Sequence, residues 1–212
     1  MKARDRILAA VRAAAPPRPA AAVAAEAAAL LADAGAARPA LAGATLSEAF
    51  EAKAAALGTT LERVAALAEV PQALLRYLQA HGLQPSVAIQ PAAEFAALDW
   101  SGIEHHDTPA PDEPVALGLA DGGIAESGSL IVHSGPRTPI LLSFLALHHV
   151  VVLRAATLVP YLEDYAERLA ADAVPRNAIL ITGPSGTTDI EGSYVRGAHG
   201  PGFLHVIVVG QG

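Results

Sequence analysis

The sequence contains no cysteine among its 212 residues. This absence excludes disulfides, cysteine–zinc sites, thiol catalysis and any cysteine-ligated iron–sulfur cluster held by this chain alone. A cysteine-free chain fits a reducing compartment, and we expect a cytoplasmic protein. The sequence also lacks any apolar run of about 18 residues without polar interruption, so we expect no membrane-spanning helix.

Basic residues are scarce as well, with 14 Lys and Arg against 21 Asp and Glu and a formal net charge of −7. Nucleic acid is therefore not an expected partner, because binding to phosphates needs a surplus of positive charge. Apolar residues make up 52% of the chain, but many of them are Ala, so the core is thinner than this figure suggests. The length suits one or two domains.

The first 45 residues differ in composition from the rest. They open with a basic, amphipathic segment in which Asp5 argues against a transit peptide, so we expect a surface helix there. Residues 20–44 are rich in Ala, which favours a helix but buries little area. We predict a helical N-terminal extension over residues 1–45 and a folded domain over 46–212.

From residue 46 onward, helical patterns alternate with short apolar, β-branched runs. A helix is predicted over 47–57, with Ser47 as N-cap and Gly58 just after its end, and another begins at Pro71. Thr157 is expected to cap a third. The predicted strands are 59–61, 87–89, 115–119, 130–132, 150–153, 177–181 and 204–209. This alternation predicts an α/β fold with a mostly parallel sheet flanked by helices.

The apolar run 177–181 is predicted to be a buried strand of the sheet, and a Gly- and Pro-containing turn directly follows it, Thr182-Gly183-Pro184-Ser185-Gly186. Ligands bind at the carboxyl ends of strands in open α/β sheets, so we interpret this turn as a candidate ligand site. Its backbone amides could hold an anion. The turn is neither a Walker A loop nor a GxGxxG loop, and a tight structural turn is the alternative interpretation.

Carboxylates accompany this turn. Asp189 and Glu191 share one side only if the backbone there is extended, whereas on a helix Thr187 and Glu191 would pair; either acid could instead cap a helix. Glu126, in the run Ala-Glu-Ser-Gly, could act as a nucleophile or general base, or could be an exposed edge carboxylate.

Three further positions carry polar side chains next to turns. Arg137 follows Gly-Pro and could clamp a carboxylate, or could be solvated. His199 is a candidate for acid–base chemistry or for holding its turn in place. The run His105-His106-Asp107 suggests a metal site, but adjacent side chains on an extended chain point to opposite faces, so we predict a polar loop and no metal. No Ser–His–Asp order can be defended, and one of the two histidines at 148–149 is expected to pack in the core.

Three blocks of sequence together resemble the lactate-utilisation protein C family, which carries the LUD domain. The blocks are Glu126-Ser127-Gly128-Ser129, then Thr182-Gly183-Pro184-Ser185-Gly186-Thr187-Thr188-Asp189-Ile190-Glu191, then Gly197-Ala198-His199-Gly200-Pro201. They resemble the family pattern in order and in spacing. The departures are all between small residues: Ser127, Ser129, Thr188 and Ala198. The resemblance covers residues 115–210 well and the first 45 residues only loosely.

The resemblance implies a Rossmann-like fold of the class shared by ribose-5-phosphate isomerase, glucosamine-6-phosphate deaminase and CoA transferases. It also implies a role in oxidising L-lactate to pyruvate beside two other subunits, one of which carries iron–sulfur clusters. This chain would then need no redox cofactor of its own. Glu126, Asp189 and His199 would be its catalytic residues. The residues expected to bind a small carboxylate or other anion are Ser127, Gly128, Arg137, Thr182, Gly183, Ser185, Thr187, Glu191 and Gly200.

Two alternatives stay open at this point. The chain could be a stand-alone enzyme of the CoA-transferase or sugar-phosphate-isomerase kind, in which Glu126 attacks an acyl thioester or acts as a base. It could also be a scaffold without catalytic activity that only holds a complex together.

Overall fold

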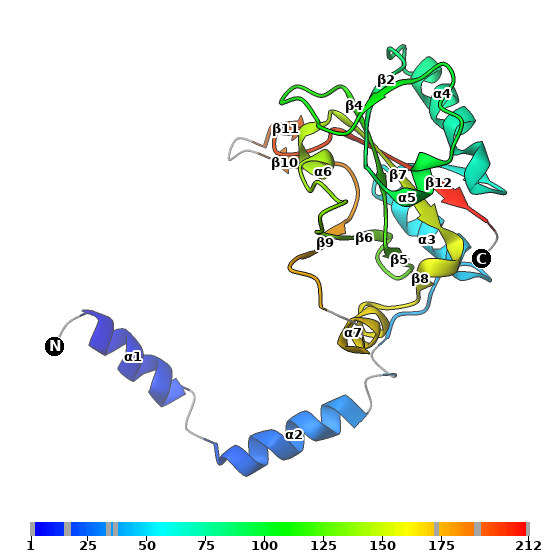
Figure 1. The fold of residues 1–212 in the computed structure, drawn as a ribbon. Coiled ribbons are helices and arrows are strands. Elements are labelled where there is room, and N and C mark those ends of the chain that lie inside the picture. The colour runs from blue at the N-terminus through cyan, green and yellow to red at the C-terminus, as the bar shows by residue number, and fades with distance from the viewer. Residues whose placement is uncertain are drawn as a thin grey trace. The chain divides into compact units, whose positions relative to one another are not determined.

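The computed structural model of the chain has two units, Met1–Ala40 and Leu41–Gly212 (Figure 1). It describes residues 3–14, 18–32, 35, 38–171, 174–188 and 192–210. The first unit holds helices α1 (Ala3–Ala14) and α2 (Ala20–Ala32), and none of their residues is buried. In the described part of the chain, no helix has both the length and the apolar character needed to cross a bilayer.

The second unit is organised around a six-stranded sheet with the order β1-β12-β7-β4-β2-β3. Every neighbouring pair in this sheet is parallel, which confirms the predicted mostly parallel α/β fold. The strands are β1 (Thr60–Val64), β2 (Ser86–Ile89), β3 (Glu104–His106), β4 (Val115–Leu119), β7 (His148–Arg154) and β12 (Phe203–Val209).

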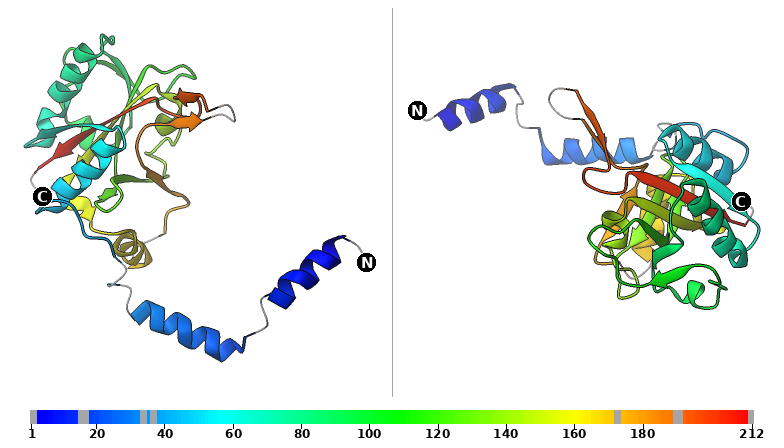
Figure 2. Two further views of the ribbon diagram at one scale, coloured as in Figure 1. Left: turned by 180° about the vertical axis from the view of Figure 1, so that it is seen from behind. Right: turned by 90° about the horizontal axis from the view of Figure 1, so that it is seen from above.

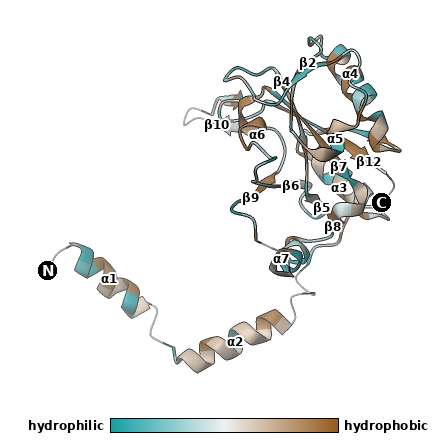
Figure 3. Ribbon diagram, in the orientation of Figure 1, coloured by the Kyte–Doolittle hydropathy of each residue, from teal (hydrophilic) through white to brown (hydrophobic). Residues whose placement is uncertain are grey.

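The two central strands explain why the sheet forms here. β7 contains the uninterrupted aliphatic run Val150–Leu153 and β12 the run Val206–Val209, and both strands are buried along most of their length (Figure 3). Such uninterrupted apolar strands are typical of parallel sheets covered by helices on both sides. Their register pairs Val151 with Val206, so β-branched side chains face the core from adjacent strands.

Helices α4 (Val70–Ala80) and α5 (Ala93–Ala96) pack on one face of this sheet (Figure 2). Pro71 occupies the first turn of α4, as predicted, where the missing N–H is not needed for helical hydrogen bonds. Leu74 and Leu78, one turn apart, are both fully buried against the strands.

The opposite face is covered by α3 (Leu46–Ala56) and by strands of a second sheet. Thr45, rather than the predicted Ser47, is the N-cap of α3: its hydroxyl accepts from the Glu48 N–H, and the Glu48 carboxylate accepts from the Thr45 N–H. Ser47 is instead buried in the first turn. Gly58 lies just beyond the helix with φ of +85°, as predicted for a residue at that position.

The second sheet has four strands in the order β8-β5-β6-β9, a feature that the sequence did not predict. Its strands are β5 (Gly122–Ile124), β6 (Ser129–His133), β8 (Leu158–Val159) and β9 (Ala178–Ile181). The prediction that 177–181 is a buried strand of the parallel sheet is therefore wrong. β9 is a partly exposed edge strand, antiparallel to β6, and short apolar runs do not distinguish the two situations.

Other predictions also need correction. Thr157 does not cap a helix; it ends the short 3₁₀ helix η3 (Ala155–Thr157), β8 follows, and α7 (Leu162–Ala171) begins only at Leu162. His105 and His106 form part of the exposed edge strand β3 rather than a loop.

The remaining elements are short. The segment between β9 and β12 holds a hairpin of β10 (Gly186–Thr188) and β11 (Tyr194–Arg196) where a loop was expected. A short helix, α6 (Leu142–Leu145), precedes β7. A 3₁₀ helix, η2 (Leu67–Glu69), precedes α4.

Candidate functional site

The first and second sequence blocks are joined by a line of hydroxyl groups. The Ser127 and Ser129 hydroxyl oxygens lie 2.7 Å apart, and the Ser129 oxygen lies 2.7 Å from that of Thr182. These contacts follow from the antiparallel pairing of β6 with β9, which brings the start of one strand beside the end of the other. The turn that carries Glu126 and the Gly-Pro-Ser turn are therefore in direct contact.

The second block is held against the third by backbone hydrogen bonds. The Ser185 N–H donates to the Pro201 carbonyl at 2.8 Å, and the Gly197 N–H donates to the Ser185 carbonyl at 2.9 Å. Gly200 faces the same serine, since a Cβ on Gly200 would lie 3.4 Å from the Ser185 Cβ. All three blocks thus form one continuous surface, which we call the three-block surface.

The end of α3 packs against two glycines of this surface. A Cβ on Gly128 would lie 2.6 Å from the Ala54 backbone nitrogen, and one on Gly183 would lie 3.0 Å from the Leu57 carbonyl oxygen. Both glycines also have positive φ, 67° and 80°, which other residues rarely adopt. Glycine is needed at both positions because the turns approach the helix backbone closely.

The other residues predicted for the site lie in different elements and differ in exposure. Glu126 is half-buried, and its backbone N–H donates to the Pro160 carbonyl. Thr187 lies in β10 and pairs with β11, and His199 is exposed in the turn before β12. Asp189 and Glu191 lie outside the residues that the structure describes.

Arg137 instead lines a cavity of about 510 Å³ at the carboxyl ends of the parallel strands. From β2 the chain continues to β3, which lies toward one edge of the sheet. From β4 it continues to β7, which lies toward the other edge. The neighbours β2 and β4 therefore mark a topological switch point, which is where open α/β sheets bind ligands. Other residues lining this switch-point cavity include Gln90, Phe95, Trp100 and Asp107.

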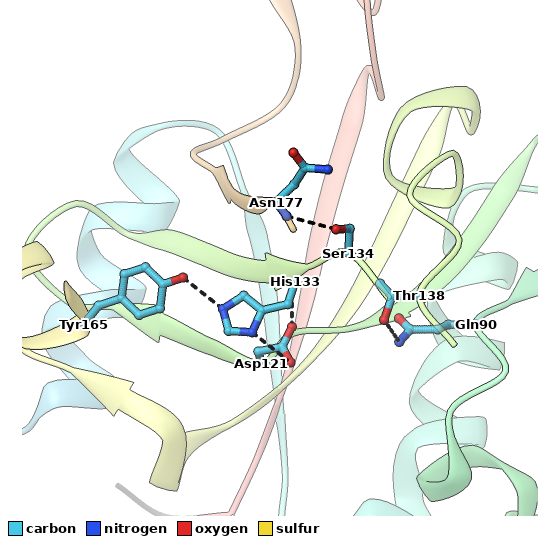
Figure 4. A network of polar contacts seen from close by, with 7 residues as sticks. All are labelled: Gln90, Asp121, His133, Ser134, Thr138, Tyr165 and Asn177. Carbon is cyan, nitrogen blue, oxygen red and sulfur yellow. Dashed lines mark hydrogen bonds and ion pairs between the residues drawn. The ribbon is translucent and has the colours of Figure 1, made fainter. Parts of the chain in front are cut away.

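Gln90, the first residue after β2, fixes the floor of the switch-point cavity. Its side-chain oxygen accepts from the Leu119 N–H at 2.9 Å. Its side-chain nitrogen donates to the Thr138 hydroxyl at 3.3 Å (Figure 4). One side chain thereby connects the ends of β2 and β4 to the loop after β6. The sequence analysis did not identify Gln90, although a polar residue directly after a buried strand is a usable signal.

Charged groups beside Arg137 form a second polar contact at this edge. Arg154, at the end of β7, makes an ion pair with Glu94 at 2.5 Å. The pKa of Glu94 is lowered, first by a backbone hydrogen bond to its carboxylate and then by the hydrogen bond from Arg154. The nearby charge of Arg137 acts in the same direction, so Glu94 is ionised at neutral pH.

Among the described residues, no group of three or more His, Asp or Glu side chains is arranged to hold a metal ion. His106 instead pairs with the buried Glu113, with its Nε2 atom 3.0 Å from a carboxylate oxygen. One of the two histidines at the start of β7 was expected to pack in the core; both are buried, and His149 is the more completely enclosed of the two. Burial lowers its pKa from 6.5 to about 4, so it is neutral at pH 7.

The fold places this chain in the α/β class of proteins. Comparisons with known proteins show which family within this class it resembles. Residues 112–209 match the model of the LUD domain family. The chain is 31% identical to "Uncharacterized protein YkgG" of Escherichia coli (strain K12) over 51% of this chain and 50% of that protein. It is 30% identical to "Lactate utilization protein C" of Anoxybacillus flavithermus over 52% and 51%.

A solved structure, of a DUF162 family protein from Deinococcus radiodurans, is similar with a TM-score of 0.59 and 27% identity. That likeness covers 78% of this chain and 96% of the other. The chain spans about half the length of the curated relatives it matches. The match of residues 112–209 to the LUD domain family model agrees with the resemblance found in the three sequence blocks.

Proposed function

We propose that this chain is a component of the system that oxidises L-lactate to pyruvate, together with partner subunits that carry iron–sulfur clusters. The proposal is supported by the LUD domain match and by relatives named for lactate utilisation. The absence of cysteine agrees with it, because the cluster ligands would have to come from another subunit. We propose a cytoplasmic location for the complex.

The observation that carries the proposal is the contact between the three sequence blocks, because these blocks are the part of the chain that resembles lactate-utilisation protein C. In this proposal the three-block surface binds a small carboxylate or a partner subunit. Glu126, Asp189 and His199 would position the ligand or exchange a proton with it. Backbone amides of the Gly-Pro-Ser turn, with the hydroxyls of Ser127 and Thr182, would hold its carboxylate.

A genetic experiment tests this role. A strain of the source organism without the gene should fail to grow on L-lactate but should grow on pyruvate, and the wild-type gene should restore growth on L-lactate. The tagged chain should co-purify with a cysteine-rich protein that contains iron. Normal growth of the deletion strain on L-lactate, with no second copy of the gene present, would show that the proposed role is wrong.

Complementation with variants separates an active site from a scaffold. Glu126→Gln keeps the size of the side chain but removes its charge, so it should fail to restore growth if Glu126 acts on the ligand. Glu163→Gln, which removes an exposed charge on α7, is the matched control and should restore it. Growth with both variants would indicate a scaffold, provided that both proteins accumulate to the wild-type level.

A further inference from the structure

A second cavity, of about 210 Å³, lies between the second sheet and α7, and none of the residues predicted from the sequence blocks lines it. Its polar lining residues are Asp121, His133, Thr157, Tyr165 and Arg168. The cavity is smaller than the roughly 300–1,000 Å³ typical of sites for drug-sized ligands. It therefore suits a molecule of only a few non-hydrogen atoms.

Three of these side chains, those of Asp121, His133 and Tyr165, form a series of polar contacts (Figure 4). One oxygen of Asp121 accepts from the His133 backbone N–H at 2.7 Å, and the other lies 3.6 Å from Nδ1 of the same residue. The Nε2 atom of His133 lies 2.9 Å from the Tyr165 hydroxyl. A proton on Nδ1, facing the carboxylate, leaves Nε2 free to accept from the tyrosine, so Asp121 sets the orientation of the whole series.

Tyr165 remains a neutral hydroxyl group in this arrangement. Its pKa is raised, first by burial and then by the negative charge of Asp121. While its proton is directed to His133, the lone pairs of its oxygen remain available to a donor on a ligand. With the imidazole turned, the hydroxyl can instead donate to a ligand oxygen.

Arg168 lies three residues after Tyr165 on α7, on the same side of the helix, and lines the same cavity. No carboxylate of the described residues forms an ion pair with Arg168. Asp121, the acidic residue in the lining, is already engaged by His133. The cavity thus offers an unengaged positive charge beside a hydroxyl group, and its apolar wall includes Ile131 and Val159.

We infer that this cavity binds a small organic monocarboxylate. The carboxylate would pair with the Arg168 guanidinium, a polar oxygen on the neighbouring carbon would bond to Tyr165, and the remaining carbon would contact Ile131 and Val159. A dianion such as phosphate fits less well, because Asp121 adds a fixed negative charge. The inference is independent of the role proposed above, since it concerns a site outside the three-block surface.

Binding can be measured by titrating the purified full-length chain with L-lactate, pyruvate, acetate and inorganic phosphate, with calorimetry and NMR as readouts. We expect saturable carboxylate binding that shifts the His133 ring signals, which report on this cavity and not on the three-block surface. Arg168→Gln should weaken binding by at least about tenfold, as expected when a charge-assisted pair is lost. Tyr165→Phe should weaken it by a smaller factor.

Arg176→Gln is the matched control, because Arg176 is exposed and does not line the cavity; it should bind as wild type does. Thermal unfolding of each variant shows whether it is folded. If Tyr165→Phe does not fold, the comparison of Arg168→Gln with wild type still tests the inference. Absence of saturable carboxylate binding would overturn the inference. So would carboxylate binding that is unchanged in Arg168→Gln, or binding of phosphate alone.

Growth on L-lactate is a separate readout. A deletion strain that grows normally would contradict the proposed function and leave the cavity assignment standing. If the deletion strain fails to grow on L-lactate but no carboxylate shifts the His133 ring signals, the cavity assignment is contradicted and the role in lactate oxidation stands.

Discussion

The hydroxyl oxygens of Ser129 and Thr182 lie 2.7 Å apart although the residues are 53 positions apart in the sequence. The contact exists because β6 and β9 are antiparallel, with Leu130 opposite Ile181. Ser129 is buried and also contacts the Ser127 hydroxyl, so it is the middle member of the series. The three-block surface therefore depends on a side chain that does not itself face solvent.

The first prediction concerns this contact. Ser129→Ala should lower the free energy of unfolding by about 1–2 kcal/mol, since it removes the shared partner of two hydroxyl groups. Thr182→Val should cost less because Thr182 is exposed. In a double-mutant cycle followed by urea unfolding, the two changes should couple by roughly 0.5–1.5 kcal/mol. Strictly additive losses would mean that the hydroxyl pair contributes nothing.

The second prediction concerns the approach of α3 to the same turn. Gly128→Ala should lower the free energy of unfolding by at least about 2 kcal/mol, because the new methyl group would overlap the Ala54 backbone and the φ of +67° is unfavourable for alanine. Gly135→Ala is the control: no atom lies within 4 Å of the added Cβ, so its effect should be small. Equal urea midpoints for the two variants would contradict the packing described.

Much of the parallel sheet could be predicted from the sequence. The segments that form β4, β7 and β12 contain continuous apolar runs, most of them β-branched. Such runs are typical of strands that are buried on both faces, so these strands could be predicted. The first turn of α4, which contains Pro71, could also be predicted, because proline has a specific preference for the first helical turn.

The second sheet could not be predicted, because its strands are short and its pairing is non-local. β8 has two residues and β5 three, and β9 resembles a buried strand in composition while forming an edge. The three sequence blocks lie in contact in the fold, and Asp189 and Glu191 lie outside the described residues. Asp121 and His133 belong to no block, and only the pairing of β5 with β6 brings them together.

A third prediction tests the part played by Gln90. Gln90→Leu keeps the volume but leaves the Leu119 N–H without its acceptor, which should cost about 1–3 kcal/mol. Thr138→Val removes only the partner of the Gln90 nitrogen and should cost less. Native-state hydrogen exchange is the most direct measurement: the Leu119 amide should exchange faster in Gln90→Leu and not in Thr138→Val. Unchanged exchange in both variants would contradict the role assigned to Gln90.

The last prediction follows from the buried imidazole of His149. Its pKa is about 4 in the folded chain and near 6.5 when the chain unfolds, so the unfolded state takes up a proton first as the pH falls. The stabilisation from keeping His149 neutral is therefore complete above pH 6.5 and is lost progressively as the pH falls toward 4. For this one group the loss between pH 7 and pH 5 should be about 2 kcal/mol.

His149→Leu removes the titrating group and should reduce the difference in unfolding free energy between pH 7 and pH 5 by about that amount. Part of the pH dependence should remain, because burial also lowers the pKa of His205 to about 4. Val151→Ala, on the same strand and face, is the control: it weakens packing without removing a proton site, so its pH 7 to pH 5 difference should match that of the wild type. An undiminished difference in His149→Leu would show that His149 is not held neutral by burial.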